Sequence, residues 1–189
     1  MEGDRRARED PRGGPTRLIE GPEPGPVRDE AAPEVGRKRG SRPWRDVLAR
    51  ARGPWRVAVV EGSMLPAIAP GDWLLVDPTV RRWPQRGSVV VFEPPDSAGL
   101  SIKRVGAGPN DVIQFGGGYL RLGHDEAWLL SDADEAAAAA AGFGAPRDSR
   151  QFGPVPLELL IGRAWFRYAP LRRIGRIGRA RGIAATSDK

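Results

Sequence analysis

Short runs of apolar and β-branched residues recur along the middle of the chain, each separated from the next by turn residues. Eight of these runs have the length and composition of β-strands. Turn signals such as Pro70-Gly71-Asp72 and Gly116-Gly117-Gly118 stand between them. The spacing predicts a mainly β domain over residues 56–170, built as an antiparallel sandwich or partial barrel. The predicted strands are 56–60, 73–77, 88–93, 100–105, 111–115, 119–122, 127–130 and 160–167.

The segments outside this pattern have a different character. Residues 1–43 are rich in Pro, Gly, Arg and Glu and bury too little apolar surface to offset ordering entropy, which predicts a disordered arm. Residues 44–55 are expected to form a short amphipathic helix or linker, because apolar residues recur at helical spacing before Gly53-Pro54. Within the β region, acidic residues and six alanines predict a short helix or flexible insertion over 132–141. Residues 171–189 form a basic tail.

The charge of the chain is concentrated in its two ends. Residues 57–160 carry 8 Lys and Arg against 13 Asp and Glu, whereas residues 161–189 carry 8 against 1. A nucleic-acid-binding domain normally presents a basic face on its folded part, so nucleic acid is not an expected partner. The glycines at 175, 178 and 182 weaken a helix in the basic tail, which is therefore expected to be solvated. A peripheral contact with an anionic membrane is the alternative for this tail.

Composition excludes several kinds of chemistry. The chain has no cysteine, and therefore no disulfide, thiolate nucleophile or zinc ribbon. Its single histidine, His124, lies in a predicted loop and is not expected to act as a base, and no metal or cofactor is expected. No apolar run approaches the roughly 18 residues that span a bilayer, and no apolar stretch typical of a signal peptide follows the charged N-terminus. The sequence thus predicts a cytoplasmic or peripherally membrane-associated protein without a transmembrane anchor.

One lysine stands out in a chain that otherwise uses arginine. Of 30 Lys and Arg residues, only Lys38, Lys103 and Lys189 are lysine, and only Lys103 lies in the predicted β domain. A strand lysine is commonly an exposed charge on a sheet edge. Burial, however, can lower the pKa of a lysine by up to about 3–5 units, and the neutral amine then accepts a proton, which arginine cannot do. A neutral lysine beside a serine hydroxyl makes that serine a nucleophile.

Three segments resemble a known family in the expected order. The first, "GSMLPAIAPGDWLLVD", resembles the nucleophile segment of the type I signal peptidases, and "SIKRVGAGPNDVI" is similar to the segment with their lysine base. The third, "RDSRQFGPVPLELLIGRAWFRYAP", resembles their C-terminal signature and is the most specific of the three. The resemblance covers residues 57–170 and implies coiled antiparallel β-sheets.

The resemblance also implies the roles of individual residues. Ser63 is expected to be the nucleophile, with its backbone N–H binding the oxyanion, and Lys103 the general base. Met64 is expected to pack beneath the site. Asp148, Ser149 and Arg150 are expected to support the site, with an ion pair between Asp148 and Arg150 that braces it without reacting. An ordinary surface salt bridge is the simpler interpretation of that pair.

The sequence departs from the family pattern at three places. Glu61 replaces a serine that completes the oxyanion hole in some members, and a carboxylate donates no hydrogen bond unless protonated. Pro146 replaces a serine that orients the lysine. Ser131-Asp132-Ala133 replaces Gly-Asp-Asn, and the alanine-rich insertion lengthens the chain before Asp148.

The predicted function is therefore a serine endopeptidase with a Ser/Lys dyad that removes an N-terminal leader or signal peptide. The precursor is expected to bind as an extended strand and to be cut after a small residue. The ending "RAWFRYAPLRRIGRIG" is similar to that of nickel-type superoxide dismutase maturation proteases, a narrower alternative that acts on one precursor. Two further classes stay open at this point: a self-cleaving repressor, and a non-enzymatic binding module that uses the tail on RNA or lipid.

Overall fold

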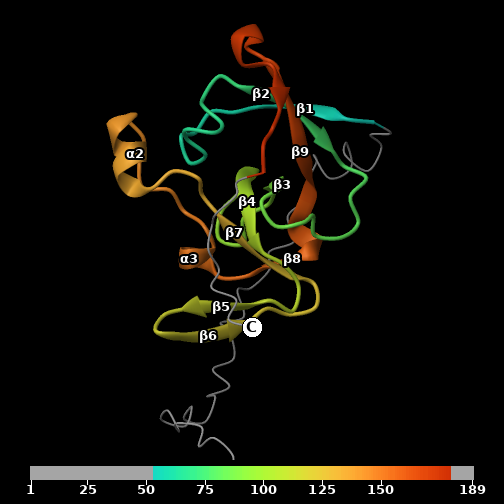
Figure 1. Cartoon of the computed structure of the whole chain (residues 1–189), viewed down its shortest axis with the longest axis vertical. Helices are drawn as coiled ribbons and strands as arrows, with labels where there is room; N and C mark the ends of the chain where they lie inside the picture. Colours follow the sequence, from blue (N-terminus) through green and yellow to red (C-terminus); the bar gives the residue numbers. More distant parts are fainter. Residues whose placement is uncertain (1–52, 180–189) are drawn as a thin grey trace, which may run out of the picture. The chain divides into compact units, whose positions relative to one another are not determined.

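The computed structural model describes residues 53–179, in which antiparallel β-strands dominate (Figure 1). One eight-stranded sheet has the strand order β1-β2-β9-β3-β4-β7-β8, with β10 paired to β9, and β5 and β6 form a separate hairpin. The mainly β, antiparallel fold predicted from the sequence is confirmed. The strands are β1 (Trp55–Ala58), β2 (Trp73–Asp77), β3 (Val89–Phe92), β4 (Ser101–Ala107), β5 (Val112–Phe115), β6 (Gly118–Arg121), β7 (Glu126–Leu130), β8 (Val155–Pro156), β9 (Leu160–Ala169) and β10 (Gly175–Arg176).

The ten-residue strand β9 holds the main sheet together. It pairs with β2 on one edge and with β3 and β10 on the other. Register shifts interrupt its pairing with β2 at two points and its pairing with β3 at one. Irregularities of this kind increase the local twist, so the long strand bends and the sheet coils around its core.

Two clusters of apolar side chains fill the two faces of this coiled sheet. Strand β3 contributes to both, because its side chains alternate: Val89 and Val91 belong to the first cluster, and Val90 and Phe92 to the second. All four are buried, which explains why this strand is a continuous apolar run in the sequence. The first cluster also contains Met64, the residue after Ser63, and therefore lies directly beneath the predicted nucleophile segment.

Two short α-helices lie in the chain between β7 and β8. Helix α2 (Glu135–Ala140) begins at Asp134, whose carboxylate accepts a hydrogen bond from the N–H of Ala137 at 2.7 Å. Helix α3 (Ser149–Phe152) begins at Asp148 with a capping box. The alanine-rich segment thus forms the short helix that was one of its two predicted states.

Each of the eight predicted strands has a counterpart in the structure, with ends displaced by a few residues. The two-residue strands β8 and β10 were not predicted. Trp55, placed at the end of the predicted linker, begins β1. The predicted disordered arm, residues 44–52 of the helix or linker, and residues 180–189 of the tail lie outside the described residues.

Residues 171–179 of the expected solvated tail are largely exposed, yet they fold back onto the β domain. The 3₁₀ helices η1 (Leu157–Leu159) and η2 (Leu171–Arg173) flank β9, and β10 then pairs back onto it. Ile177 packs against the first core cluster. This part of the chain thus belongs to the β domain. Among residues 53–179, no helix combines the length and apolar character needed to cross a bilayer.

Candidate active site

The candidate nucleophile, Ser63, lies in a tight helical turn after β1. The N–H of Leu65 donates to the carbonyl of Gly62 at 3.1 Å, and the N–H of Ile68 donates to that of Met64 at 2.8 Å. Met64 and Ile68 are both buried in the first core cluster, as expected for Met64. Their burial fixes the turn on the sheet, and Ser63, directly before Met64, stays partly exposed.

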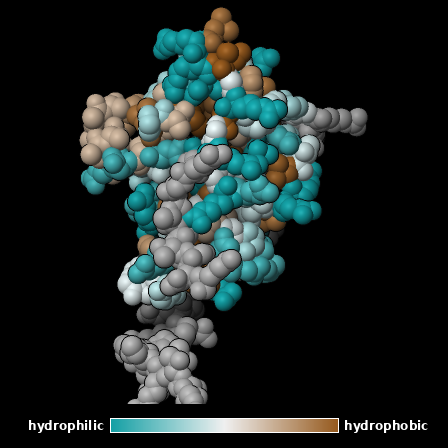
Figure 2. Space-filling view, viewed as in Figure 1, coloured by the Kyte–Doolittle hydropathy of each residue, from teal (hydrophilic) through white to brown (hydrophobic). Residues whose placement is uncertain are grey.

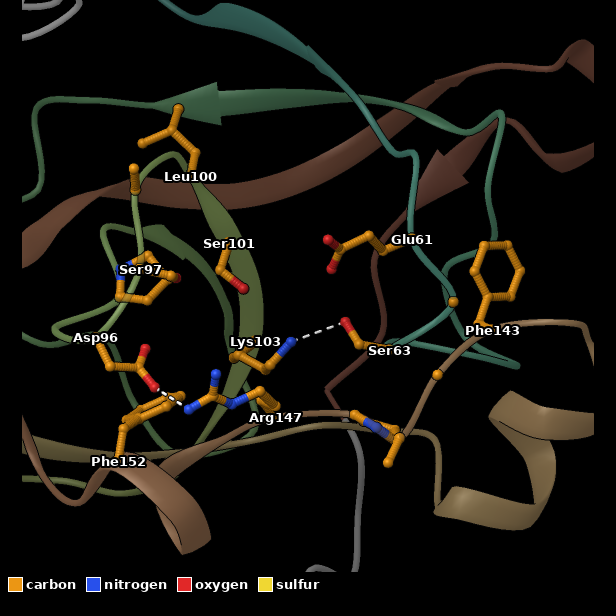
Figure 3. A pocket seen from close by; sticks show the side chains of 16 residues that line it. Glu61, Ser63, Asp96, Ser97, Leu100, Ser101, Lys103, Phe143, Arg147 and Phe152 are labelled. Atoms are coloured by element: carbon orange, nitrogen blue, oxygen red, sulfur yellow. Dashed lines mark hydrogen bonds and ion pairs between the residues drawn. The ribbon is translucent and has the colours of Figure 1, made fainter.

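Lys103 reaches the same point from strand β4, forty residues further along the chain. Its side chain is 2% exposed, and its Nζ lies 2.8 Å from Ser63 Oγ (Figure 3). The carbonyl of Ser63 also accepts a hydrogen bond from the N–H of Ala133 at 3.1 Å, which ties the turn to the segment after β7. The structure therefore brings together the serine and the lysine that the sequence singled out.

The surroundings of Lys103 favour its neutral form. Burial lowers the pKa of the Lys103 ammonium, while the negative charges of Glu61, Asp148 and Asp132 oppose that shift, and the net pKa is below its ordinary value. A neutral amine within hydrogen-bond distance of a hydroxyl can accept its proton. This pair of groups therefore has the geometry and the electrostatics of a nucleophile and its base.

Asp148 is completely buried and joins the start of helix α3 to the segment after β7. Its Oδ2 accepts from the N–H of Ser131 at 2.9 Å and from Arg150 at 2.7 Å, and its Oδ1 accepts from Arg150 Nε at 3.0 Å. Burial alone would raise the pKa of the Asp148 carboxyl, but these hydrogen bonds outweigh it and lower the pKa below its usual value. Asp148 and Arg150 form an ion pair in which the carboxylate is fully buried and the Arg150 side chain is 53% exposed.

Ser149 joins helix α3 to the neighbouring strand. Its Oγ accepts a hydrogen bond from the N–H of Leu129 in β7 at 2.9 Å, and Ser149 is fully buried. Strand β7 pairs in turn with β4, the strand of Lys103. Ser149 thus fixes helix α3 to the strand beside that of Lys103, and the Asp148 charge reaches the lysine without a hydrogen bond to its amine.

An ion pair that the sequence analysis missed lies next to Lys103. The side chain of Arg104 is also 2% exposed, and its Nε and terminal nitrogen bind the two carboxylate oxygens of Asp132 at 2.7 and 2.5 Å. Its other terminal nitrogen donates to the carbonyls of Gly87 at 2.6 Å and Gly178 at 3.0 Å. Adjacent residues of a strand face opposite sides, so Arg104 locks β4 from the side away from Ser63. The sequence offers one sign of this ion pair, because Lys103 and Arg104 are adjacent basic residues in an acidic domain.

The serine and lysine open into a pocket of about 460 Å³ (Figure 3). Two residues noted as departures from the family pattern, Glu61 and Pro146, line it. Phe143 also lines it and was missed, because nothing in the sequence marks an aromatic after the alanine-rich helix as close to Ser63. Asp96 and Arg147 form an ion pair within the same lining.

The positions of other polar groups also limit which chemistry the site can perform. The backbone N–H of Ser63 makes no hydrogen bond within residues 53–179 and is free to bind an oxyanion. Ser131 Oγ is buried without a hydrogen-bond partner in the same part of the chain. His124 is exposed in the loop between β6 and β7, as expected. In the described ranges, no three His, Asp or Glu residues gather as metal ligands would.

Comparison with known proteins agrees with this geometry. The family model described as signal peptidase, peptidase S26, matches residues 50–136, which include both Ser63 and Lys103. A mitochondrial ATP-independent inner membrane protease subunit 1b of Arabidopsis thaliana is 31% identical over 120 residues, which cover 61% of this chain and 70% of that protein. The chain belongs to the signal peptidase family, peptidase S26. A signal peptidase I of Leptolyngbya laminosa is 29% identical over 140 residues, covering 61% of this S26 peptidase and 69% of the relative.

Membership in the S26 family decides between the classes of function that the sequence left open. The protein is a serine endopeptidase of the signal peptidase type, which removes signal peptides from precursor proteins. The resemblance seen in the sequence and the predicted enzyme class are confirmed. The self-cleaving repressor and the non-enzymatic binding module are not supported. The match to the family model ends at residue 136, so it does not include helix α3 of this S26 peptidase.

Proposed function

We propose that Ser63 is the nucleophile of this peptidase and Lys103 its general base. The observation that carries this proposal is the 2.8 Å contact between Ser63 Oγ and a buried Lys103 Nζ whose pKa is lowered. Neutral Lys103 accepts the Ser63 proton as Oγ attacks the scissile carbonyl. The resulting oxyanion is bound by the Ser63 N–H.

The same two residues complete the reaction. Protonated Lys103 donates its proton to the nitrogen of the departing peptide as the C–N bond breaks, which leaves an ester on Ser63 and restores the neutral amine. Lys103 then accepts a proton from water as that water attacks the ester, and the proton returns to Ser63 Oγ as the ester bond breaks. Every proton taken up by Lys103 is given back within one cycle.

The test is cleavage of a precursor peptide by three variants. Ser63→Ala and Lys103→Ala are expected to abolish cleavage while the proteins stay folded, and Lys103→Arg is expected to be inactive as well, since arginine keeps the charge but accepts no proton. His124→Ala serves as the control and is expected to cleave normally. An active Lys103→Arg enzyme would refute the general-base assignment.

We propose further that the precursor binds as an extended strand between two chain segments next to Ser63. A small pocket of about 70 Å³ lies between residues 57–61 and 100–102 and is lined mainly by aliphatic residues. Strand β1 is at the edge of the sheet, where an added strand finds free hydrogen-bonding groups.

The size of this pocket supports a small residue before the cut. An enclosed cavity of about 150 Å³ holds a benzene ring, so a pocket of about 70 Å³ suits a methyl group better than an aromatic side chain. Glu61 lines its rim, but most of its lining, Met64 included, is apolar, and its size leaves little room for a long charged side chain. Peptides that differ only in the residue before the cut test this: Ala is expected to be cleaved, and Phe or Arg to be rejected. Preferential cleavage after Arg would overturn the proposal.

Two substrates test the narrower alternative of a dedicated maturation protease: a nickel-type superoxide dismutase precursor and an unrelated signal peptide. A dedicated maturation protease is expected to cut only the first. A general signal peptidase cuts both.

A peripheral membrane contact of the segment that begins at residue 171 is a second proposal, supported by exposed side chains. Leu171 is 81% exposed and Ile174 54%, and both follow the end of β9, where apolar and hydrophilic groups lie close together (Figure 2). Arg172 supplies an adjacent positive charge for anionic headgroups. Flotation with anionic vesicles is expected to be lost in the Leu171→Ser/Ile174→Ser variant. Equal flotation of both proteins would refute a contact through these two side chains, and a wild type that does not float would refute the membrane contact itself.

A further inference from the structure

Two pockets lie next to Ser63. They share Glu61, Ser63, Leu100 and Ser101, so they form one continuous groove. Lys103 lines the larger pocket and not the smaller one. Because the base of the proposed mechanism must protonate the departing nitrogen, the departing peptide has to lie on the Lys103 side. The larger pocket therefore receives the residues after the cut, and the smaller one those before it.

The charges that line the larger pocket are balanced except at one position. Asp96 and Arg147 form an ion pair with each other. Lys103 is buried and hydrogen-bonded to Ser63. Glu61 is exposed, and its carboxylate makes no hydrogen bond or ion pair with any of residues 53–179. The remaining lining is largely apolar or small: Pro94, Ala98, Leu100, Phe143, Ala145, Pro146 and Phe152.

The position of Glu61 allows its carboxylate to contact a bound substrate. It lies two residues before Ser63, and Figure 3 shows its carboxylate directed into the pocket, near Ser101 and the Ser63 hydroxyl. The pocket volume of about 460 Å³ is large enough for a long side chain. A carboxylate at this position, whose charge also acts on Lys103, attracts a cationic side chain of a bound peptide and repels an anionic one.

We propose that Glu61 is a specificity-determining residue that pairs with a lysine or arginine within the first two residues after the cut. This inference rests on the proposed function, because the Ser63 and Lys103 roles define which side of the groove is which. It gives the substrate class as precursors whose mature chain begins with a basic residue in its first two positions. Glu61, which cannot complete the oxyanion hole as a serine would, thereby has a role in substrate binding.

The test uses peptides that share the same residues up to an alanine at the cut and differ after it. Lys, Gln or Glu is placed at the first or the second position after the cut, and kcat/KM is measured for each peptide. The wild-type enzyme is expected to prefer Lys over Gln by about three- to tenfold and to disfavour Glu at one of these positions. High salt is expected to shrink the preference.

Two variants decide whether Glu61 causes this preference. In Glu61→Gln the Lys/Gln ratio is expected to fall to about one, and in Glu61→Lys the order is expected to reverse. The ratio is informative because any effect of Glu61 on the Lys103 base acts on both peptides and cancels. Glu135→Gln removes the same charge from exposed helix α2, outside both pockets, and is expected to keep the wild-type ratio.

A binding measurement separates this inference from the catalytic proposal. The Ser63→Ala protein is expected to bind the Lys peptide more tightly than the Gln peptide, and Ser63→Ala/Glu61→Gln is expected to bind them equally. A Lys preference that survives Glu61→Gln, or no preference in the wild type, would overturn the inference while leaving the dyad intact. Failure of the wild type to cleave any of these peptides would overturn the proposed function and, with it, the assignment of the two sides.

Discussion

Phe143 lies against Gly62 so closely that the glycine can carry no side chain. A Cβ added to Gly62 would stand 2.5 Å from Phe143 Cδ2 and 2.9 Å from Phe143 Cγ, well inside contact distance. Phe143 follows helix α2, and its N–H donates to the carbonyl of Ala138 at 2.9 Å, which fixes the aromatic residue to that helix. The alanine-rich insertion therefore supplies a wall of the site, and the peptide before Ser63 is positioned by it.

The first prediction follows from this contact. Gly62→Ala is expected to reduce kcat by about tenfold or more, because a displacement of about 1 Å in a reacting group is enough for a loss of that order. Phe143→Ala in the same chain is expected to recover part of the loss, since it removes the ring that the new methyl meets. A double-mutant cycle on kcat measures this coupling.

Gly108→Ala is the matched control for Gly62→Ala. A Cβ there would meet only Asp111 Oδ2 at 3.9 Å, an ordinary contact, and Gly108 lies outside both pockets. Its kcat is expected to equal that of the wild type. Additive effects of Gly62→Ala and Phe143→Ala would show that the ring does not position the turn.

The second prediction concerns the pH dependence of activity. The proposed base acts in its neutral form, so kcat/KM is expected to fall as pH decreases through the lowered pKa of Lys103. The negative charge of Glu61 raises that pKa, against the larger effect of burial. Glu61→Gln is thus expected to move the acid limb of the profile to lower pH. A limb that stays in place, or moves to higher pH, would contradict this assignment.

The third prediction concerns the buried carboxylate of Asp148. In Asp148→Asn one oxygen becomes an NH₂ group, which cannot accept the hydrogen bonds now made by Ser131 or Arg150. The free energy of unfolding at neutral pH is expected to fall by about 1–3 kcal/mol, as measured by urea denaturation. Asp125→Asn, in the exposed loop next to His124, is expected to change it by less than about 0.5 kcal/mol.

The same variant also changes how stability depends on pH. The pKa of Asp148 is lower in the folded protein than in the unfolded chain, so its contribution is present above the unfolded pKa. It is lost as pH falls through the folded value. Stability measured below about pH 4 should therefore decrease less steeply in Asp148→Asn than in the wild type. Parallel curves would show that this carboxyl does not carry the predicted linkage.

The sequence predicted the strands well because each is bounded by local signals. Apolar and β-branched runs set the strands, and Pro-Gly-Asp and Gly-Gly-Gly turns set their limits. Lys103 was recognisable because one lysine stands among arginines in an acidic domain. In each case the information lies within a few residues, and a local pattern is sufficient to read it.

What the sequence did not predict depends on contacts between distant segments. The two-residue strands β8 and β10 are too short for any pattern and exist only because β7 and β9 pair with them. Arg173 lies in a segment with the composition of a solvated tail, and its pairing with Asp72, about a hundred residues earlier in the chain, is visible only in the folded protein. Phe143 was missed for the same reason, since only the folded chain brings it to Gly62.

The last prediction tests whether residues 171–179 support the nucleophile turn. Asp72 is 1% exposed, and its carboxylate binds Arg167 and Arg173, each at 3.1 Å. Arg173 also donates to the carbonyls of Pro66 and Ala67 at 3.3 Å, within the segment that follows Ser63. This arginine therefore links the C-terminal segment to the chain that leaves the active-site turn.

Arg173→Ala is accordingly expected to lower both the stability and kcat of the enzyme. Loss of one partner of a buried ion pair costs about 3–5 kcal/mol, but Arg167 still neutralises Asp72, so about 1–3 kcal/mol is expected. Arg172→Ala is the matched control, because its neighbouring guanidinium makes no hydrogen bond or ion pair within residues 53–179. It should alter stability by less than about 0.5 kcal/mol. Urea denaturation and kcat of the two variants decide the matter: equal, small effects would show that the C-terminal segment does not brace Ser63.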